Sequence, residues 1–250
     1  MGGGRGLAFE SWRLRIRDRD GAVLGAGVLL GDRTVLTCAH VLPPDHEVVV
    51  DFVGQRDVPS ALARVVPGCL VPPGDDQRGD VALLRLDHPV DAAFGTSLRR
   101  AALSWNRPVR TLGFPQGLEY GVWTKLVLAA GVGPGWEWVQ MNLVAGEPPV
   151  RPGFSGAGVS DEETGEVLGI VASVNRRESS GLSWMLPVEI ILSYLPDLEE
   201  FATGSRAVDP GFHAVHADNL IHAGKRHTQP KRPKRSRATV AIRVMSSSTA

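Results

Sequence analysis

A regular series of short apolar runs, separated by Gly- and Pro-rich turns, constrains the fold more than any other feature. From residue 12 to residue 186, about a dozen such runs recur at a spacing of about ten residues. Several alternate apolar and polar side chains, as in Trp12–Arg17, which is the pattern of a strand with one buried face. The series predicts an all-β protein built as a sandwich or as barrels.

The predicted strands fall into two groups of about six, divided by a break near Ala92–Leu103. They are Trp12–Arg17, Ala22–Leu30, Thr34–Thr37, Glu47–Phe52, Ala61–Val66, Val81–Leu86, Val109–Gly113, Lys125–Ala130, Trp136–Leu143, Gly158–Ser160, Val167–Val174 and Leu182–Leu186. After them, Pro187 precedes apolar residues at 188, 191, 192 and 195. That pattern predicts a closing helix at 188–195.

The formal net charge of zero conceals two oppositely charged parts. Residues 1–200 carry a net −7, whereas residues 201–250 hold 9 basic and 2 acidic side chains, a net +7. We expect 1–200 to form the folded domain. The basic tail, 201–250, has too little apolar surface to offset its ordering entropy, which predicts disorder. Such a tail suits an acidic partner, with nucleic acid or a membrane surface as weaker alternatives.

Other classes of protein are disfavoured by what the chain lacks. No run approaches the roughly 20 apolar residues of a membrane span, and Met1–Trp12 has no signal-peptide core. Two cysteines, Cys38 and Cys69, are too few for a disulfide framework. We therefore expect a cytoplasmic protein with both thiols reduced and buried. The histidines of the tail have no spacing typical of a metal module, and we expect neither a metal nor an organic cofactor.

Three short segments contain the residues with catalytic potential. They are Thr37–His40, which ends a strand, Gly79–Leu84, in which an Asp opens a strand, and Gly153–Ala157, in which glycines flank a serine. Each alone has a common structural explanation as a packed histidine, a turn aspartate or a tight turn. Their combination and order are much more specific.

Together, the three segments resemble the chymotrypsin-like (trypsin-like) serine proteases. Thr37-Cys38-Ala39-His40 is similar to that family's T-A-x-H segment, Gly79–Leu84 contains its D-[IV]-A-L-L segment, and Gly153–Ala157 is similar to its G-[DN]-S-G-G loop. Gly113–Gly117 and Trp184–Val188 are further similar to segments of bacterial members and of the high-temperature-requirement proteases. The resemblance covers about residues 8–198.

This resemblance implies a fold and an activity. The fold would be two antiparallel six-stranded β-barrels, at about 8–100 and 101–187, with the catalytic cleft between them. The activity would be that of a serine endopeptidase acting through an acyl-enzyme, with Ser155 as nucleophile, His40 as base and Asp80 orienting the imidazole. The N–H groups of Gly153 and Ser155 would form the oxyanion hole.

Residues that would contact a protein or peptide substrate are also implied by the resemblance. Pro149 occupies the position where trypsins carry an acid, so a preference for Arg or Lys is not supported. The strand that pairs with substrate backbone would comprise Val171, Ala172, Ser173 and Val174. We expect a small or medium apolar side chain before the cleaved bond.

Two departures from the family pattern affect the nucleophile loop. Phe154 replaces the usual Asp or Asn, which argues against activation by a newly cut N-terminus and predicts a less firmly held oxyanion loop. Ala157 replaces a glycine, a small change if its φ is negative. Chains of this kind resemble protease modules attached to bacterial signalling or defence proteins, which implies one specific protein substrate.

Two other interpretations compete with the protease. An α/β-hydrolase would need G-x-S-x-G on a strand-to-helix turn, but Gly153–Ala157 lacks the last glycine and alternating strands and helices are absent. A catalytically silent barrel could instead bind peptides or partner proteins by strand addition. Phe154 keeps this second alternative open.

Overall fold

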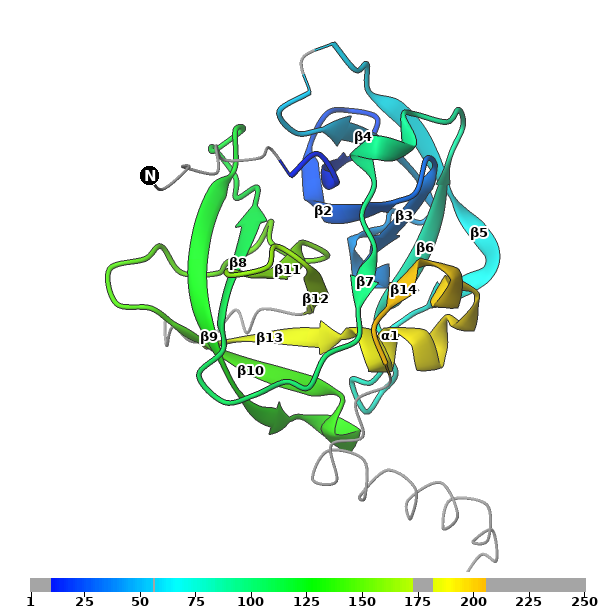
Figure 1. Cartoon of the computed structure of the whole chain (residues 1–250). Coiled ribbons are helices and arrows are strands. Elements are labelled where there is room, and N and C mark those ends of the chain that lie inside the picture. Colours follow the sequence, from blue (N-terminus) through cyan, green and yellow to red (C-terminus); the bar gives the residue numbers. More distant parts are fainter. Residues whose placement is uncertain (1–9, 56, 173–181, 206–250) are drawn as a thin grey trace, which may run out of the picture.

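The first of two β-barrels is formed by the N-terminal third of the chain (Figure 1). The computed structural model describes residues 10–55, 57–172 and 182–205. The first barrel closes in the order β1-β2-β3-β6-β5-β4. Its strands are β1 (Arg13–Arg17), β2 (Val23–Leu30), β3 (Thr34–Thr37), β4 (Glu47–Phe52), β5 (Ala61–Val71) and β6 (Val81–Leu86).

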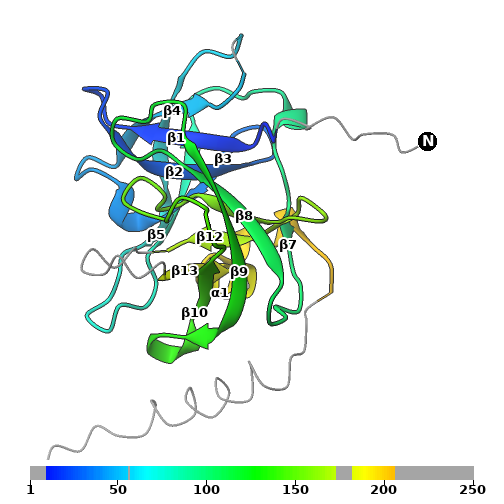
Figure 2. The ribbon, with the colours of Figure 1, turned by 90° about the vertical axis from the view of Figure 1, so that its left-hand side faces the viewer.

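The second barrel lies beside the first (Figures 1 and 2). Its strands are β8 (Pro108–Gly113), β9 (Val122–Val132), β10 (Trp138–Leu143), β11 (Gly158–Asp161), β12 (Val167–Val171) and β13 (Leu182–Pro187). They pair in the order β11-β8-β9-β10-β13-β12, and pairing of β11 with β12 closes the ring. All six pairings are antiparallel. The predicted fold of two six-stranded antiparallel barrels is therefore confirmed.

The segment between the barrels contains structure that the sequence pattern did not indicate. Within the predicted break lie η2 (Ala92–Phe94) and the two-residue strand β7 (Leu98–Arg99). β7 pairs in parallel with β12 on one side and with β14 (Ala202–Thr203) on the other. Two short strands are thus added to β12 of the second barrel, and they lie on the side that faces the first barrel and α1 (Figure 1).

A closing helix, α1 (Val188–Tyr194), is present where the sequence predicted one. It follows directly on β13 of the second barrel, yet Ile191 and Leu192 belong to the same buried apolar cluster as the core of the first barrel. The 3-10 helix η4 (Pro196–Phe201) continues it, and Phe201 packs against the turn at Gly31. The C-terminal end of the described chain therefore braces the two barrels. The basic tail lies outside the described residues from 206 onward.

A buried arginine joins the barrels at their interface. The guanidinium of Arg13, on β1, donates hydrogen bonds across the junction to the carbonyl of Gly158 (3.2 Å) and to Ser160 Oγ (3.0 Å), both on β11. Its side chain lies against the ring faces of Trp12 and Trp123, at 4.0 and 4.4 Å from the ring centroids. Arg13 is 3% exposed, so these contacts replace nearly all of its water.

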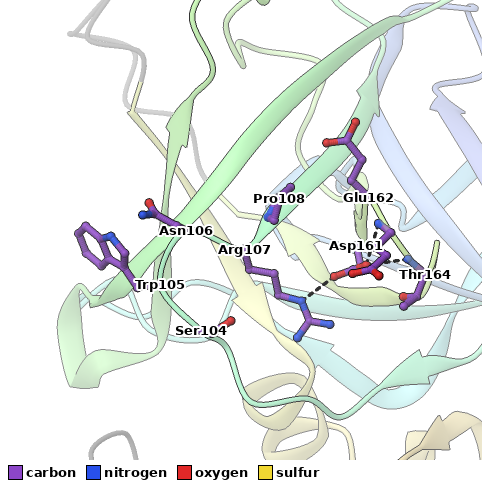
Figure 3. Close-up of a pocket in the computed structure, with 9 residues that line it drawn as sticks. Ser104, Trp105, Asn106, Arg107, Pro108, Asp161, Glu162 and Thr164 are labelled. Atoms are coloured by element: carbon purple, nitrogen blue, oxygen red, sulfur yellow. Dashed lines mark hydrogen bonds and ion pairs between the residues drawn. The ribbon is translucent and has the colours of Figure 1, made fainter.

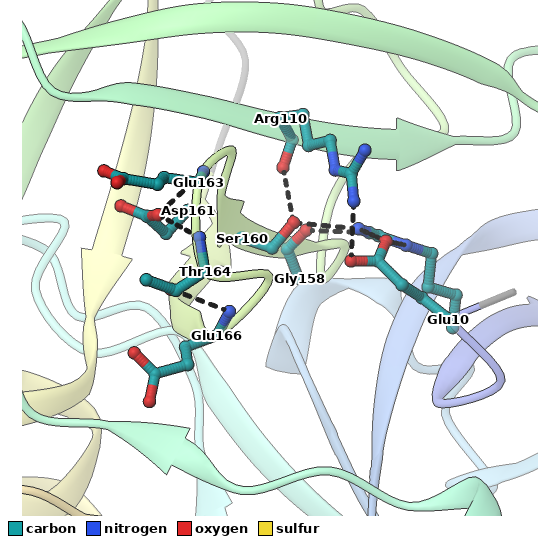
Figure 4. Close-up of polar contacts among 9 residues, drawn as sticks. Glu10, Arg110, Gly158, Ser160, Asp161, Glu163, Thr164 and Glu166 are labelled. Carbon is teal, nitrogen blue, oxygen red and sulfur yellow. Dashed lines mark hydrogen bonds and ion pairs between the residues drawn. The ribbon is translucent and has the colours of Figure 1, made fainter. Parts of the chain in front are cut away.

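The charge of Arg13 is compensated by Glu10. Burial lowers the pKa of Arg13 to about 10, so the guanidinium is still protonated at neutral pH. Glu10 accepts from Arg13 Nε (2.8 Å) and also from Arg110 Nη2 on β8 (3.1 Å), as Figure 4 shows for Arg110. One carboxylate therefore serves cations from both barrels. A buried cation with a hydrogen-bonded partner is tolerated, whereas an isolated one is costly.

We expect Arg13→Met to destabilise the protein by about 3 kcal/mol, because it leaves the partly buried Glu10 carboxylate with one cation fewer and removes two cross-barrel hydrogen bonds. Thermal unfolding followed by circular dichroism measures the effect. Lys125→Met is the control, since it removes an exposed cation paired with Glu162 and should change the melting temperature little. Glu10→Gln combined with Arg13→Met should melt above Arg13→Met alone. Equal melting temperatures for Arg13→Met and the control would contradict this role.

Within residues 10–55, 57–172 and 182–205, no helix has the length and apolar character needed to cross a membrane.

Candidate active site

His40 and Asp80 form a pair held together at two points. His40 lies in the short helix η1 (Ala39–Val41), directly after β3. Its backbone N–H donates to Asp80 Oδ1 (2.9 Å), and its Nδ1 lies 2.6 Å from Asp80 Oδ2. Asp80 is 8% exposed, whereas the His40 side chain is 38% exposed. With Nδ1 engaged by the carboxylate, Nε2 is the ring nitrogen left for proton transfer.

The backbone before β6 is bent to bring Asp80 to this position. Gly79 has φ +87° and Asp80 has φ +68°, so two successive residues occupy the left-handed region. That conformation costs a non-glycine residue about 1–2 kcal/mol. A Cβ on Gly79 would also lie 3.2 Å from the carbonyl oxygen of Pro72. The pairing of Ala82 with Thr37 then places Asp80 beside the corner that carries His40.

The Ser155 loop comes from the second barrel and packs against the strands that precede His40. The Ser155 carbonyl accepts a hydrogen bond from the Ala26 N–H (2.9 Å) on β2. Gly156 has φ +81°, and a Cβ there would lie 2.3 Å from both the Ala26 carbonyl and Thr37 Oγ1. The glycine that follows the serine is therefore what allows this close approach. Ser155 is itself 8% exposed.

Within the part of the chain that the structure describes, no hydrogen bond joins the Ser155 hydroxyl to His40. Such contacts are often longer in enzymes without substrate and tighten when substrate binds. The three predicted residues are thus brought to one junction, with one of the two expected hydrogen bonds formed.

The backbone N–H groups of the Ser155 loop alternate between bonded and unbonded among the described residues. The Phe154 N–H donates to the Arg151 carbonyl (3.1 Å), and the Gly156 N–H donates to Val171 (2.9 Å). By contrast, the N–H groups of Gly153 and Ser155 have no acceptor among the described residues. Alternating bonded and free groups of this kind can accept a developing oxyanion.

Phe154 holds the Ser155 loop by apolar packing. Its side chain is fully buried in the core of the second barrel together with Phe114 and Val159. The ring occupies space left by Gly113, where a Cβ would lie 2.2 Å from a ring carbon. The loop therefore has an apolar anchor at the position where the family usually carries Asp or Asn. Whether it is held less firmly than in the family stays a prediction. Ala157 is not among the described residues with positive φ, so its backbone needs no glycine.

The two cysteines are free and buried, as expected. Cys38 Sγ donates to the Val171 carbonyl (3.3 Å), and burial, followed by the nearby Asp80 carboxylate, raises the pKa of this thiol well above its usual range. Donor atoms of Cys38, His40 and Asp80 lie within 4.8 Å of one another. A metal ion there would need the thiolate and would compete for the His40–Asp80 contact, so the arrangement suits a catalytic pair better than a metal centre.

The predicted substrate-binding residues are only partly within the described chain. Pro149 is exposed in the segment between β10 and β11. Val171 is buried, and its N–H donates to the Ala157 carbonyl (2.8 Å), while the Ala172 N–H donates to Trp184 (2.9 Å). Both N–H groups therefore already donate to carbonyl groups of the second barrel. Ser173 and Val174 lie outside the described residues.

A separate pocket of about 480 Å³ lies on the second barrel (Figure 3). It is lined by Ser104–Pro108 and Asp161–Thr164 and contains none of the residues of the His40 junction. Asp161 accepts from Arg107 Nε (2.6 Å) and from the N–H of Thr164 (2.7 Å). These bonds, seen in Figures 3 and 4, stabilise the β11–β12 turn and leave the carboxylate well satisfied.

Glu137 is a buried acid near the candidate site that the sequence reasoning missed. It is 4% exposed and accepts hydrogen bonds from the Gly79 N–H (3.1 Å) and the Tyr194 hydroxyl (2.6 Å). The available signal was an acidic residue between Trp136 and Trp138, at the start of a predicted strand. That pattern indicates a buried position for Glu137 but does not identify its hydrogen-bond partners.

The paired barrels, with a histidine–aspartate pair on one and a glycine-flanked serine on the other, place the chain in the chymotrypsin-like fold class. A family model of the trypsin-like peptidase domain matches residues 25–170. The chain belongs to this family of trypsin-like peptidases.

A curated protein of the same kind is similar in sequence to this chain. The chain is 25% identical over 244 residues to the putative protease Do-like 14 of Arabidopsis thaliana, covering 92% of this chain and 53% of the relative. It thus spans about half the length of this curated relative.

Solved structures share the fold. The HtrA-type protease AlgW with a decapeptide is 21% identical, with a TM-score of 0.56 over 72% of this chain and 52% of that one. Kallikrein-related peptidase 10 in complex with Zn²⁺ is 16% identical, with a TM-score of 0.61 over 77% and 97%. The resemblance to trypsin-like and high-temperature-requirement (HtrA/Do) proteases is therefore confirmed.

The packing of Phe154 on Gly113 can be tested by adding one methyl group. Gly113→Ala should destabilise the protein by about 1–3 kcal/mol, because the new Cβ overlaps the Phe154 ring. It should also slow labelling of Ser155 by a fluorophosphonate probe, since Phe154 is adjacent to Ser155. A second change, Phe154→Leu, should recover part of the melting temperature lost in Gly113→Ala. If Gly113→Ala melts and labels like the unmodified protein, Phe154 does not anchor the loop.

Proposed function

We propose that this protein is a serine endopeptidase in which Ser155 is the nucleophile, His40 the general base and Asp80 the group that orients the imidazole. Membership of a trypsin-like peptidase family supports a protease in general. The observation that carries the finer proposal is the two-point contact of His40 with Asp80, beside a loop whose Ser155 carbonyl is bonded to the adjoining barrel.

The proposed reaction proceeds in two similar halves. His40 Nε2 accepts the proton of Ser155 Oγ as the oxygen attacks the substrate carbonyl carbon, and the carbonyl oxygen becomes an oxyanion bound by the N–H groups of Gly153 and Ser155. The protonated imidazole, stabilised by Asp80, gives its proton to the leaving amine, which departs as the acyl-enzyme forms. Water then repeats the sequence, releasing the acid and restoring Ser155.

The proposed substrate is an extended segment of a protein or peptide. One structural neighbour, AlgW, carries a decapeptide, and peptide pairing beyond Ala172, along Ser173 and Val174, would follow the same family pattern. Pro149 offers no charge to a basic side chain, so we propose a small or medium apolar residue before the cleaved bond.

Activation of this protein would not require a newly cut N-terminus. Phe154 is fully buried among apolar side chains and cannot form the ion pair on which that route depends. From the resemblance to protease modules of bacterial signalling or defence proteins, we further propose a cytoplasmic signalling or defence role with one specific protein substrate. The charge asymmetry of the sequence supports an acidic partner for the basic tail.

A catalytically silent, peptide-binding module is the second candidate function. It is favoured by one observation, namely that no hydrogen bond joins the Ser155 hydroxyl to His40 within the described ranges.

Covalent labelling separates the two functions. The unmodified protein should react with a fluorophosphonate probe at Ser155 and hydrolyse peptides, whereas Ser155→Ala and His40→Ala should do neither, because the triad acts as a unit. Asp80→Asn should retain the fold and lose about 10⁴-fold in kcat through the wrong imidazole tautomer. Ser104→Ala, at the separate pocket, is the control and should keep full activity.

One outcome would contradict the assignment of Ser155, and another would contradict the protease. Labelling that persists in Ser155→Ala would show a different nucleophile. Absence of labelling in the unmodified, folded protein, together with retained binding of peptides, would favour the silent module.

A further inference from the structure

Glu137 connects three separate parts of the chain through one buried carboxylate. It lies between η3 (Pro134–Trp136) and β10, in the second barrel. Its Oε2 accepts from the N–H of Gly79 in the first barrel (3.1 Å), and its Oε1 accepts from the hydroxyl of Tyr194 on α1 (2.6 Å). At 4% exposure, the carboxylate depends on these two donors in place of water.

The groups around Glu137 include a hydroxyl donor and a nearby cation. Burial raises the pKa of Tyr194, and the hydrogen bond to Glu137 raises it further, so this hydroxyl stays protonated and remains a donor. The pKa of Arg78 is also raised, mainly by its hydrogen bond to Asp76 and additionally by the Glu137 charge. Hydrogen bonds to a charged acceptor are stronger than those between neutral groups. The carboxylate is therefore a firm attachment point.

Glu137 binds the backbone of Gly79, the residue directly before Asp80. Gly79 and Asp80 both have positive φ, at +87° and +68°, and a strained backbone of this kind persists only where surrounding contacts fix it. The Glu137 bond fixes the Gly79 N–H. From that position Asp80 reaches both the backbone N–H and Nδ1 of His40.

We propose that Glu137 is a positioning residue for the His40–Asp80 pair. With Tyr194, it keeps Asp80 in the strained conformation from which it orients the imidazole. This inference rests on the proposed function, because it assigns Glu137 a role in aligning that triad. Neither Glu137 nor Tyr194 touches the reacting atoms.

The activity test compares three variants. Glu137→Ala should lower kcat about 10²-fold, the cost typical of a small misplacement of catalytic groups, while changing KM little. The acid limb of the pH–rate profile should also move to lower pH, because the protonated imidazole loses part of its carboxylate contact. Glu137→Gln should recover most of kcat, since its amide oxygen can accept from Gly79 and its NH₂ can donate to the Tyr194 oxygen.

Matched controls separate positioning from simple loss of folded protein. Glu163→Ala removes an exposed acid at the separate pocket and should leave the rate and the pH profile unchanged. Endpoint labelling of Ser155 counts active sites, so a smaller amount of folded protein would lower the count without moving the acid limb. If Glu137→Ala fails to fold, Tyr194→Phe keeps the carboxylate and should produce a smaller loss with the same direction of pH shift.

A second measurement does not depend on hydrolysis. In a Ser155→Ala background, the proton shared by His40 Nδ1 and Asp80 should give a far-downfield NMR resonance, and adding Glu137→Ala should abolish it or move it upfield. The proposal is overturned if that resonance is unchanged, if Glu137→Gln is no better than Glu137→Ala, or if the acid limb stays fixed. Should the unmodified protein not hydrolyse peptides, the proposed function fails, while the resonance still decides whether Glu137 positions the pair.

Discussion

The junction between the two barrels sets the geometry of the whole candidate site, because His40 and Asp80 belong to one barrel and Ser155 to the other. Three kinds of contact fix that junction. The buried Arg13 cation bonds to β11, the Gly156 backbone packs tightly against β2 and β3, and Glu137 binds the Gly79 N–H. The contacts of Arg13 and Glu137 rely on buried polar groups with defined partners, so they specify relative orientation as well as adding stability.

The loop that carries Ser155 is held by a different kind of force. Where relatives place an acidic or amide side chain, Phe154 is buried against Gly113. Apolar packing does not titrate, so this anchor is independent of pH and needs no cationic partner. It does require the absence of a side chain at position 113, which links a glycine on β8 to the serine loop that lies 40 residues later in the sequence.

Much of the fold could be predicted because each barrel strand has a local pattern of apolar and β-branched residues. The strand boundaries and short strands that were missed lie where strand pairing, rather than the local residue pattern, determines the structure. β5 continues to Val71, beyond Pro67 and Gly68, because it pairs with β6 on both sides of an irregularity. β7 and β14 have two residues each, too few for any periodicity, and exist only through pairing with distant chain.

The residues of the candidate site also differ in whether local sequence indicates them. Short motifs indicated His40, Asp80 and Ser155, since each lies in a recognisable local context. No local motif could indicate the role of Glu137, because its hydrogen-bond partners Gly79 and Tyr194 are 58 and 57 residues away in the sequence. Its contribution depends on how the second barrel and α1 meet the first barrel, which is a property of tertiary packing.

The strain at Asp80 explains why such a distant contact is needed. A relaxed backbone would put the carboxylate elsewhere, so the two-point contact with His40 requires φ +68° at a non-glycine residue, at a cost of about 1–2 kcal/mol. The bonds to His40 offset part of that cost, but they depend on the imidazole being in place. Glu137 adds a tie on the opposite side of Asp80, at Gly79, that does not involve His40. In the proposed mechanism, this tie would keep the pair aligned throughout the reaction cycle.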